Sequence, residues 1–215
     1  MKSESQIAES ARSEAIHSLL LTKARGRHPR LANVISGNGV LSAGNKQTEC
    51  IVRFLARIVV GQQLSSVAAR SIWNRVCALA KVHSCNVTDL FEERYVTEIQ
   101  SCGVSASKAR AMIMMRHAFD HGDLAGTQLN AASYEEIVKQ VTALWGFGAW
   151  SADMVAIFFV QLPDVWPTSD AALIRGMKLL APGEAIEGVV ADYRPYRSYL
   201  ARHVWYGLDS GKISG

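Results

Sequence analysis

Apolar residues recur along the chain at the three- to four-residue spacing of an amphipathic helix. The pattern is clear at Ile51, Phe54, Leu55 and Ile58, which fall on one face of a helix. No stretch alternates polar and apolar residues for long enough to indicate a strand. The sequence therefore predicts an all-α protein. The expected helices span residues 5–23, 29–36, 48–60, 65–80, 88–100, 106–121, 133–144, 150–160, 169–180 and 194–207.

Composition narrows the class of protein. The chain has 215 residues, of which 49% are hydrophobic and 20% charged, enough for the core of one domain or of two small lobes. No apolar run has the length of a membrane span, and the N-terminal residues lack the apolar core of a secretory signal. We therefore expect an intracellular protein with no membrane partner. The four cysteines show no CxxC spacing, so a structural zinc site is not expected.

The segment Leu144-Trp-Gly-Phe-Gly-Ala-Trp-Ser-Ala152 predicts two helices joined by a glycine turn. Gly146 and Gly148 permit a turn with positive φ and leave the backbone bare, and Phe147 is expected to pack between the helices. The first N–H groups of the second helix, which begins near Trp150, would then be available to a phosphate. Taken alone, the segment fits an ordinary αα-hairpin better than a binding site.

A single carboxylate follows this hairpin. Asp170 lies 22 residues after Gly148, at the start of the next expected helix and after a loop that contains Pro167. An aspartate in this position is most often a helix cap.

Taken together, hairpin, helix, proline-containing loop and aspartate resemble the helix-hairpin-helix/Gly-Pro-Asp DNA glycosylases, and most closely their AlkA-like branch, the 3-methyladenine DNA glycosylases II. Three further motifs support the resemblance, which runs from about residue 28 to 206. They are IVVGQQLS at residues 58–65, HPRL at 28–31 with His in place of the family's Asp, and RPYRSY at 194–199 followed by HVW at 203–205.

The resemblance implies a particular architecture. Residues 45–163 would form a middle helical lobe that carries the hairpin, and residues 1–44 and 164–215 would together form the second lobe. The active-site cleft between the lobes would hold a nucleotide flipped out of the duplex. The chain is similar to the compact form that lacks an additional N-terminal domain.

The resemblance also implies a reaction. The chain would be a monofunctional glycosylase of base excision repair that hydrolyses the N-glycosidic bond of alkylated bases of the N3-methyladenine and N7-methylguanine type. Asp170 would be the catalytic carboxylate, and an abasic site would remain. Trp150 stands where bifunctional relatives place a Schiff-base lysine, so simple hydrolysis is expected.

The expected partner is double-stranded DNA with alkylated or otherwise damaged bases, bound by a monomer in the bacterial cytoplasm or the eukaryotic nucleus. No cofactor or catalytic metal is expected, and the absence of cysteines after Cys102 excludes the iron–sulfur cluster of endonuclease III-type relatives. A structural cation could bridge the hairpin carbonyls and a phosphate.

Several site residues follow from the resemblance with alternatives left open. Trp150 and Trp205 match aromatic positions of the base pocket, with core packing as the alternative, and Met154 replaces a pocket tyrosine. Gln62 and Gln63 match the side chains that fill the gap left by the flipped base. They could also be a polar helix end.

Two alternative functions and five basic residues remain to be considered. A non-enzymatic binder of damaged or abasic DNA on the same fold is the main alternative, because Met154 departs from the family and Ser169 replaces the second acid often found beside the catalytic Asp. A helical protein–protein adaptor leaves the spacing of Asp170 unexplained. The cations, which would lie on a DNA face or simply in solvent, are Lys108, Arg110, Arg116, Arg175 and Lys178.

Overall fold

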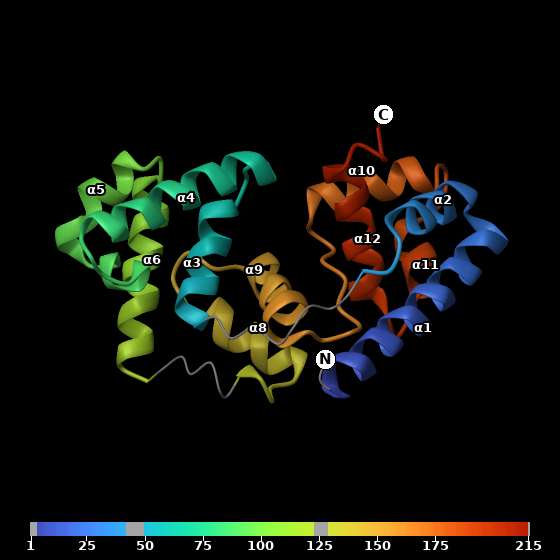
Figure 1. Ribbon diagram of the computed structural model, residues 1–215, viewed down its shortest axis with the longest axis horizontal. Helices are drawn as coiled ribbons and strands as arrows, with labels where there is room; N and C mark the ends of the chain where they lie inside the picture. Colours follow the sequence, from blue (N-terminus) through green and yellow to red (C-terminus); the bar gives the residue numbers. More distant parts are fainter. Residues whose placement is uncertain (1–3, 42–49, 123–128, 215) are drawn as a thin grey trace. The chain divides into compact units, whose positions relative to one another are not determined.

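The computed structural model describes residues 4–41, 50–122 and 129–214, and no strand occurs in these ranges (Figure 1). The all-α class is confirmed. Residues 48 and 49 of the expected helix 48–60 lie outside the described residues. The elements are α1 (Glu4–Arg27), α2 (Pro29–Asn38), α3 (Ile51–Gly61), α4 (Ser66–Val82), η1 (Val87–Leu90), η2 (Glu93–Tyr95), α5 (Val96–Ser101), α6 (Ala106–Asp120), α8 (Tyr134–Thr142), α9 (Ala149–Met154), the π-helical segment η3 (Val155–Val160), α10 (Ala171–Leu180), α11 (Ile186–Ala191) and α12 (Arg197–Asp209).

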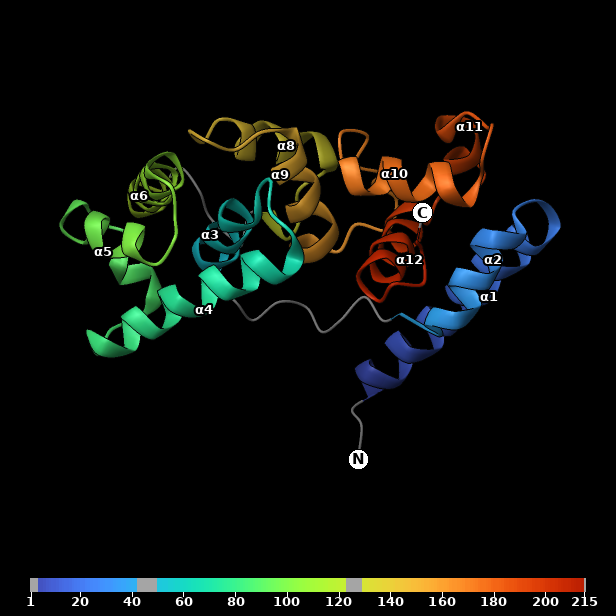
Figure 2. The same ribbon diagram turned by 90° about the horizontal axis from the view of Figure 1, so that it is seen from above.

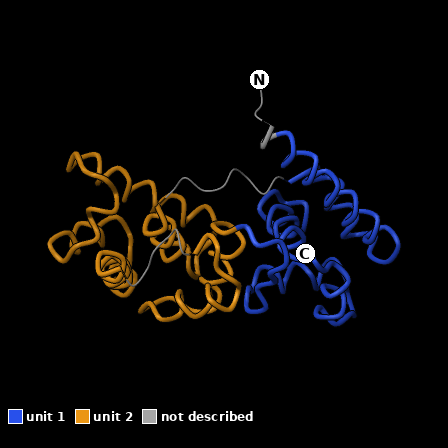
Figure 3. Tube along the Cα trace, turned by 90° about the horizontal axis from the view of Figure 1, so that it is seen from below, with its two compact units in different colours: residues 1–45, 161–215 blue, residues 46–160 orange. Residues whose placement is uncertain are grey.

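The chain divides into two compact units, which Figure 3 distinguishes by colour. Unit 1 comprises residues 1–45 and 161–215, and unit 2 comprises residues 46–160.

Unit 1 joins the two ends of the chain, as the blue and red helices in Figures 1 and 2 show. Helix α12 packs against both α2 and α10. Two glycines permit the close approach of α12. A Cβ at Gly176 would lie 2.6 Å from Cγ1 of Val204, and a Cβ at Gly207 would lie 2.8 Å from Cγ1 of Val34. The core of unit 1 includes the fully buried side chains of Leu31, Ile35, Leu173, Met177, Leu200 and Val204.

Unit 2 is built around α3, which contacts α4, α6 and α9. Of the apolar face that the sequence predicts for α3, Ile51, Phe54 and Leu55 are buried and Ile58 is half-buried. The rings of Phe54 and Phe159 pack at a centroid distance of 5.3 Å. Helices α8 and α9 pack against each other and form the predicted hairpin. Helix α3 therefore supports the hairpin through α9.

The expected helix over residues 88–100 is wrong. The chain forms the short helical turns η1 and η2 before α5, and Glu92 between them is extended (φ −133°, ψ 155°). Leu90 and Phe91 are both fully buried. The extended backbone at Glu92 interrupts the helical hydrogen bonding, so the segment does not form one continuous helix.

Helix α11 was not predicted, because its six residues are too few to show a helical period and include Gly188. Its burial depends on tertiary contacts of Val189 and Val190. Within the described ranges, no helix combines the length and the apolar character that a membrane span requires.

Candidate functional site

The hairpin begins with a capped helix. Ser133 and Glu136 form the predicted capping box: the Ser133 Oγ accepts from the Glu136 N–H at 3.3 Å, and the Glu136 Oε2 accepts from the Ser133 N–H at 2.7 Å. Tyr134 donates its hydroxyl to the Asp153 Oδ1 at 2.7 Å, which ties α8 to α9. Asp153 is 4% exposed. Sequence reasoning missed it, although a carboxylate on the buried face of a hairpin helix is a signal that could have found it.

The two hairpin glycines have different conformations. Gly146 has a φ of +86°, as predicted. Gly148 does not: its φ is −111° and its ψ −172°, because it is the extended N-cap residue of α9. Of the two glycines, Gly146 therefore supplies the positive φ of the turn. Phe147 between them is buried, at 5% exposure.

The surroundings of the two glycines also differ. A Cβ at Gly146 would lie 2.7 Å from the Cβ of Ala111 on α6, so a side chain there would clash. A Cβ at Gly148 would meet no atom within 4 Å. Packing therefore requires a glycine at Gly146 and leaves open space at Gly148.

The segment between α3 and α4 contains Gln62 and Gln63, which the sequence analysis gave the same role but which have different contacts in the structure. Gln62 donates its Nε2 to the Gly146 carbonyl and to the Ser151 Oγ, both at 3.2 Å, so its side chain is bonded to the hairpin. Gln63 has a φ of +57° and is exposed. Leu64 is 42% exposed. Gln63 and Leu64 are therefore the side chains that this segment presents outward.

The cations of α6 also have different roles. Lys108 donates its Nζ to the carbonyls of Val60 (2.9 Å) and Gln62 (2.7 Å), and burial lowers the pKa of its amine. It thus fixes the end of α3 and the start of the Gln62 segment. Arg116 pairs with Asp120 and Asp89.

The other hairpin-helix residues of the expected pocket lie on α9 itself. Trp150 is half-buried, and Met154 is 4% exposed. Both belong to unit 2, together with the hairpin and the Gln62 segment.

Asp170 and Trp205 lie together in unit 1. Asp170 is the N-cap of α10, where its Oδ1 accepts from the Leu173 N–H at 2.8 Å. The same oxygen accepts from the Trp205 Nε1 at 3.3 Å. Asp170 is 8% exposed, and Trp205 is half-buried against the core of unit 1. The carboxylate is therefore oriented by a helix N-terminus and by an indole N–H.

The loop that leads to Asp170 is bonded to the first turn of α12. Arg197 donates its Nε to the Asp164 Oδ1 at 2.6 Å and its Nη2 to the Asp164 Oδ2 at 3.0 Å. Burial raises the pKa of Asp164, but the hydrogen bonds from Arg197 outweigh it and hold that pKa below its usual value. Ser198 donates its hydroxyl to the Leu162 carbonyl at 2.7 Å and accepts from the Val165 N–H at 2.9 Å.

The RPYRSY motif, which carries part of the family resemblance, includes Arg197 and Ser198. The structure gives these two residues a role, since their side chains fix the segment that carries Asp170. Trp205, two helical turns further along α12, holds the other end of the same segment through the carboxylate itself.

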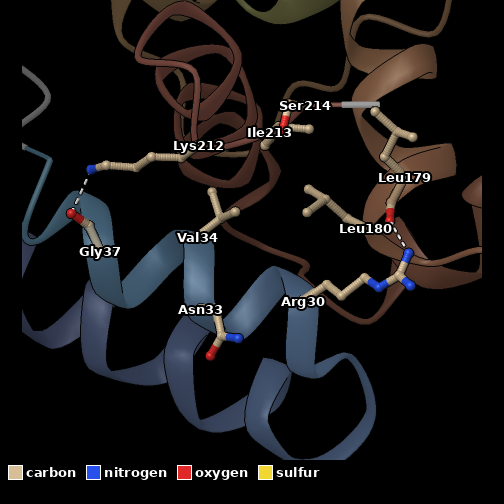
Figure 4. A pocket seen from close by; sticks show the side chains of 9 residues that line it. All are labelled: Arg30, Asn33, Val34, Gly37, Leu179, Leu180, Lys212, Ile213 and Ser214. Carbon is tan, nitrogen blue, oxygen red and sulfur yellow. Dashed lines mark hydrogen bonds between the residues drawn. The ribbon is translucent and has the colours of Figure 1, made fainter.

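A separate cavity of about 650 Å³ lies in unit 1, lined by α2, α10 and the C-terminal residues (Figure 4). It does not include Asp170, and no carboxylate lines it. Its two cations are bonded to main-chain carbonyls, Arg30 to Leu179 at 3.2 Å and Lys212 to Gly37 at 2.5 Å. This cavity is therefore separate from the segment that carries Asp170.

Among the described residues, no three His, Cys, Asp or Glu side chains cluster in a way that could hold a metal ion. The Gly146 carbonyl of the hairpin already accepts from Gln62.

The two predicted cations of α10, Arg175 and Lys178, are both exposed.

Comparison with known proteins identifies the fold. No family model matches the chain. Its fold is that of a solved 3-methyladenine DNA glycosylase from Schizosaccharomyces pombe in complex with abasic DNA, with a TM-score of 0.65 and 23% identity over 82% of this chain and 88% of that one. This chain therefore has the fold of the helical DNA glycosylases.

Sequence similarity then gives the family. The chain is 30% identical over 159 residues to DNA-3-methyladenine glycosylase 1 of S. pombe. This match covers 70% of this chain and 69% of the relative. It is 24% identical over 193 residues to DNA-3-methyladenine glycosylase 2 of Escherichia coli, covering 83% of this chain and 66% of the relative. The chain belongs to the DNA-3-methyladenine glycosylase family, which confirms the predicted AlkA-like resemblance.

Proposed function

We propose that this protein hydrolyses the N-glycosidic bond of alkylated bases in duplex DNA, of the N3-methyladenine and N7-methylguanine type, and leaves an abasic site. The observation that carries the proposal is the oriented carboxylate of Asp170, held by the Leu173 N–H and the Trp205 indole. Family membership supplies the substrate class. The bacterial cytoplasm or the eukaryotic nucleus is the compartment in which we expect this reaction.

Asp170 would act through charge. Cleavage of the glycosidic bond develops positive charge on the sugar, as in glycoside hydrolysis. A fixed carboxylate stabilises that charge without reorganising, and it can orient the attacking water. At a separation of about 4 Å and an effective dielectric constant of about 20, the attraction is about 4 kcal/mol. That energy corresponds to a rate increase of roughly a thousandfold.

The leaving group explains the preference for cationic bases. A positively charged base departs as a neutral molecule, so the reaction needs no strong general acid. Trp205, whose indole contacts Asp170, would add cation–π attraction of about 0.5–2 kcal/mol to such a base. This preference is small, so we expect neutral damaged bases to be released slowly as well.

The hairpin would bind the DNA backbone. The first N–H groups of a helix have no intrahelical partner and attract phosphate, and Gly148 at the N-cap of α9 leaves space for close approach. Gln63 and Leu64 are the candidates for filling the gap in the duplex, since Gln62 is bonded to the hairpin. The mechanism uses no cofactor, and a cation at the hairpin stays a prediction.

Base release from methylated DNA tests the proposal. Duplex DNA treated with a methylating agent that carries a radiolabelled methyl group is incubated with the protein, and the released bases are separated by chromatography. We expect N3-methyladenine and N7-methylguanine in the soluble fraction. A protein that binds abasic duplex tightly but releases no base would instead be the damage-binding alternative.

Borohydride trapping tests the hydrolytic mechanism. Because Trp150 occupies the position of the Schiff-base lysine, we expect no covalent protein–DNA complex after reduction during turnover. A trapped complex would show an amine nucleophile and contradict the monofunctional reaction.

A further inference from the structure

An exposed tryptophan directly precedes the first hairpin glycine. Trp145 is 43% exposed, whereas its neighbours Leu144 and Phe147 are 9% and 5% exposed. Tryptophan is highly buried on average in folded proteins and is enriched at interfaces. A partly exposed indole beside a turn of this kind is therefore a candidate contact for the ligand of the turn.

An arginine lies against this indole. The guanidinium carbon of Arg110, on α6, is 4.7 Å from the centre of the Trp145 ring, and Arg110 is itself exposed. The next residue, Ala111, packs against Gly146 so closely that a Cβ on the glycine would lie 2.7 Å away. The contact between α6 and the hairpin thus places Arg110 at the edge of the turn.

The charge of Arg110 is not compensated by the residues that the structure describes, since none of their carboxylates forms an ion pair with it. Its neighbours on α6 differ in this respect. Arg116 pairs with Asp120 and Asp89, and Lys108 is bonded to main-chain carbonyls. Arg110 is thus the cation of this trio whose guanidinium remains available for an anion.

We propose that Arg110, held in place by Trp145, binds a second backbone phosphate of the DNA beside the one at the hairpin. Arginine presents a planar set of N–H donors that matches a phosphate, and stacking on an aromatic ring leaves these donors at its edge. The stacked conformation also reduces the side-chain freedom that binding would otherwise remove. This inference rests on the proposed function, because it requires a DNA substrate.

The salt dependence of DNA binding separates this role from simple packing. Each phosphate that a protein neutralises contributes about 0.9 to the slope of log affinity against log salt. Arg110→Gln should therefore lower the slope by about 0.9 and weaken binding roughly tenfold at about 0.1 M salt. The loss should be equal for an undamaged duplex and for one with a tetrahydrofuran abasic-site analogue, because phosphate contacts do not read the base.

Arg94 offers a matched control in the same unit. Its guanidinium lies 4.9 Å from the Tyr95 ring, but it already pairs with the Glu92 carboxylate at 2.9 Å. Arg94→Gln should leave both the affinity and the slope unchanged. Fluorescence anisotropy with the two labelled duplexes measures both quantities, and thermal unfolding shows that each variant is folded.

Two further variants separate the charge from its aromatic support. Arg110→Lys should keep the slope, since the charge remains. Trp145→Leu should also keep the slope but weaken binding by roughly threefold, because the arginine loses its stacked conformation. A Trp145 variant whose slope falls as much as that of Arg110→Gln would contradict the division of roles.

Failure of this inference is distinguishable from failure of the proposed function. If the wild-type protein binds duplex and releases methylated bases, but Arg110→Gln behaves like Arg94→Gln, the second phosphate contact is overturned and the glycosylase function stands. A wild-type protein that neither binds duplex DNA nor releases base would overturn both.

Discussion

The two units differ in how tightly their candidate functional segments are held by hydrogen bonds and packing. In unit 1, the segment that leads to Asp170 is bonded to α12 through Ser198 at one end and Trp205 at the other. In unit 2, the hairpin is tied internally through Gln62, while open space remains at Gly148. The carboxylate that we propose to react has to be fixed within a fraction of an ångström, whereas the proposed DNA contact has to leave space for the duplex. The difference teaches which polar groups serve the fold and which serve the ligand.

The strongest test of this contrast removes the charge of Asp170 and keeps its shape. Asp170→Asn should lower the rate of N7-methylguanine release by roughly a thousandfold, because the neutral amide no longer stabilises the charged sugar. Asparagine caps helices as well as aspartate does, so the unfolding free energy and duplex binding should change little. Single-turnover kinetics measure the rate. A variant as fast as the wild type would remove Asp170 from the reaction.

The paired hairpin glycines separate fold from ligand binding within unit 2. Gly146→Ala should destabilise the protein by about 2–3 kcal/mol, because the residue has positive φ and its Cβ would contact Ala111. Gly148→Ala should cost less than about 1 kcal/mol, the difference between the two residues as helix N-caps. Urea unfolding measures both. The Gly148 variant should nevertheless bind damaged and undamaged duplex more weakly, and equal stability of the two variants would contradict the contrast.

Lowering the pH should destabilise unit 1 before unit 2. Burial, and then the charge of the nearby His17, lower the pKa of His203 to about 3. The folded pKa lies below the unfolded value of about 6.5, so the stabilisation is complete above that pH and is lost as the pH falls toward 3. The loss should reach roughly 2 kcal/mol at pH 5.

Urea unfolding at several pH values from 7 to 5 measures this loss. His203→Gln should remove most of the dependence, whereas His121→Gln, at an exposed position of unit 2, should not. A pH dependence that survives in the His203 variant would assign the effect to other groups.

The smallest effect concerns the indole N–H of Trp205. Trp205→Phe keeps an aromatic ring but loses the donor to Asp170, and should slow base release roughly tenfold, since a hydrogen bond to a charged group contributes about 1.5 kcal/mol. Release of cationic N7-methylguanine and neutral hypoxanthine should fall in the same proportion. Trp205→Ala should then reduce only the cationic substrate further, by up to about 2 kcal/mol. Unequal losses in the Phe variant would point to a role in base recognition alone.

The sequence predicted the elements whose signals are local. The periodic face of α3, the capping box at Ser133 and the turn at Gly146 each depend on neighbouring residues, and each is present. The helix expected over residues 88–100 is interrupted by the extended backbone at Glu92, and α11 was missed because tertiary packing stabilises it.

The site was predictable only in part, for the same reason. Asp170 and the hairpin were found from their spacing and from resemblance. The bonds from Gln62 to Gly146, from Arg197 to Asp164 and from Trp205 to Asp170 join segments at least 33 residues apart, and no local pattern encodes them. Contacts of this kind also decide which member of a motif is structural, as the two glutamines show.

Gly148 has a consequence for how this family's sequences change with time. The fold itself does not need a glycine there, because the backbone is extended and the space beside it is empty. Serine or aspartate would cap α9 better. In a gene copy released from selection for DNA binding, we expect Gly148 to drift toward these capping residues while Gly146, which the packing requires, stays. The identity of residue 148 would then record the loss of the DNA role before any loss of stability.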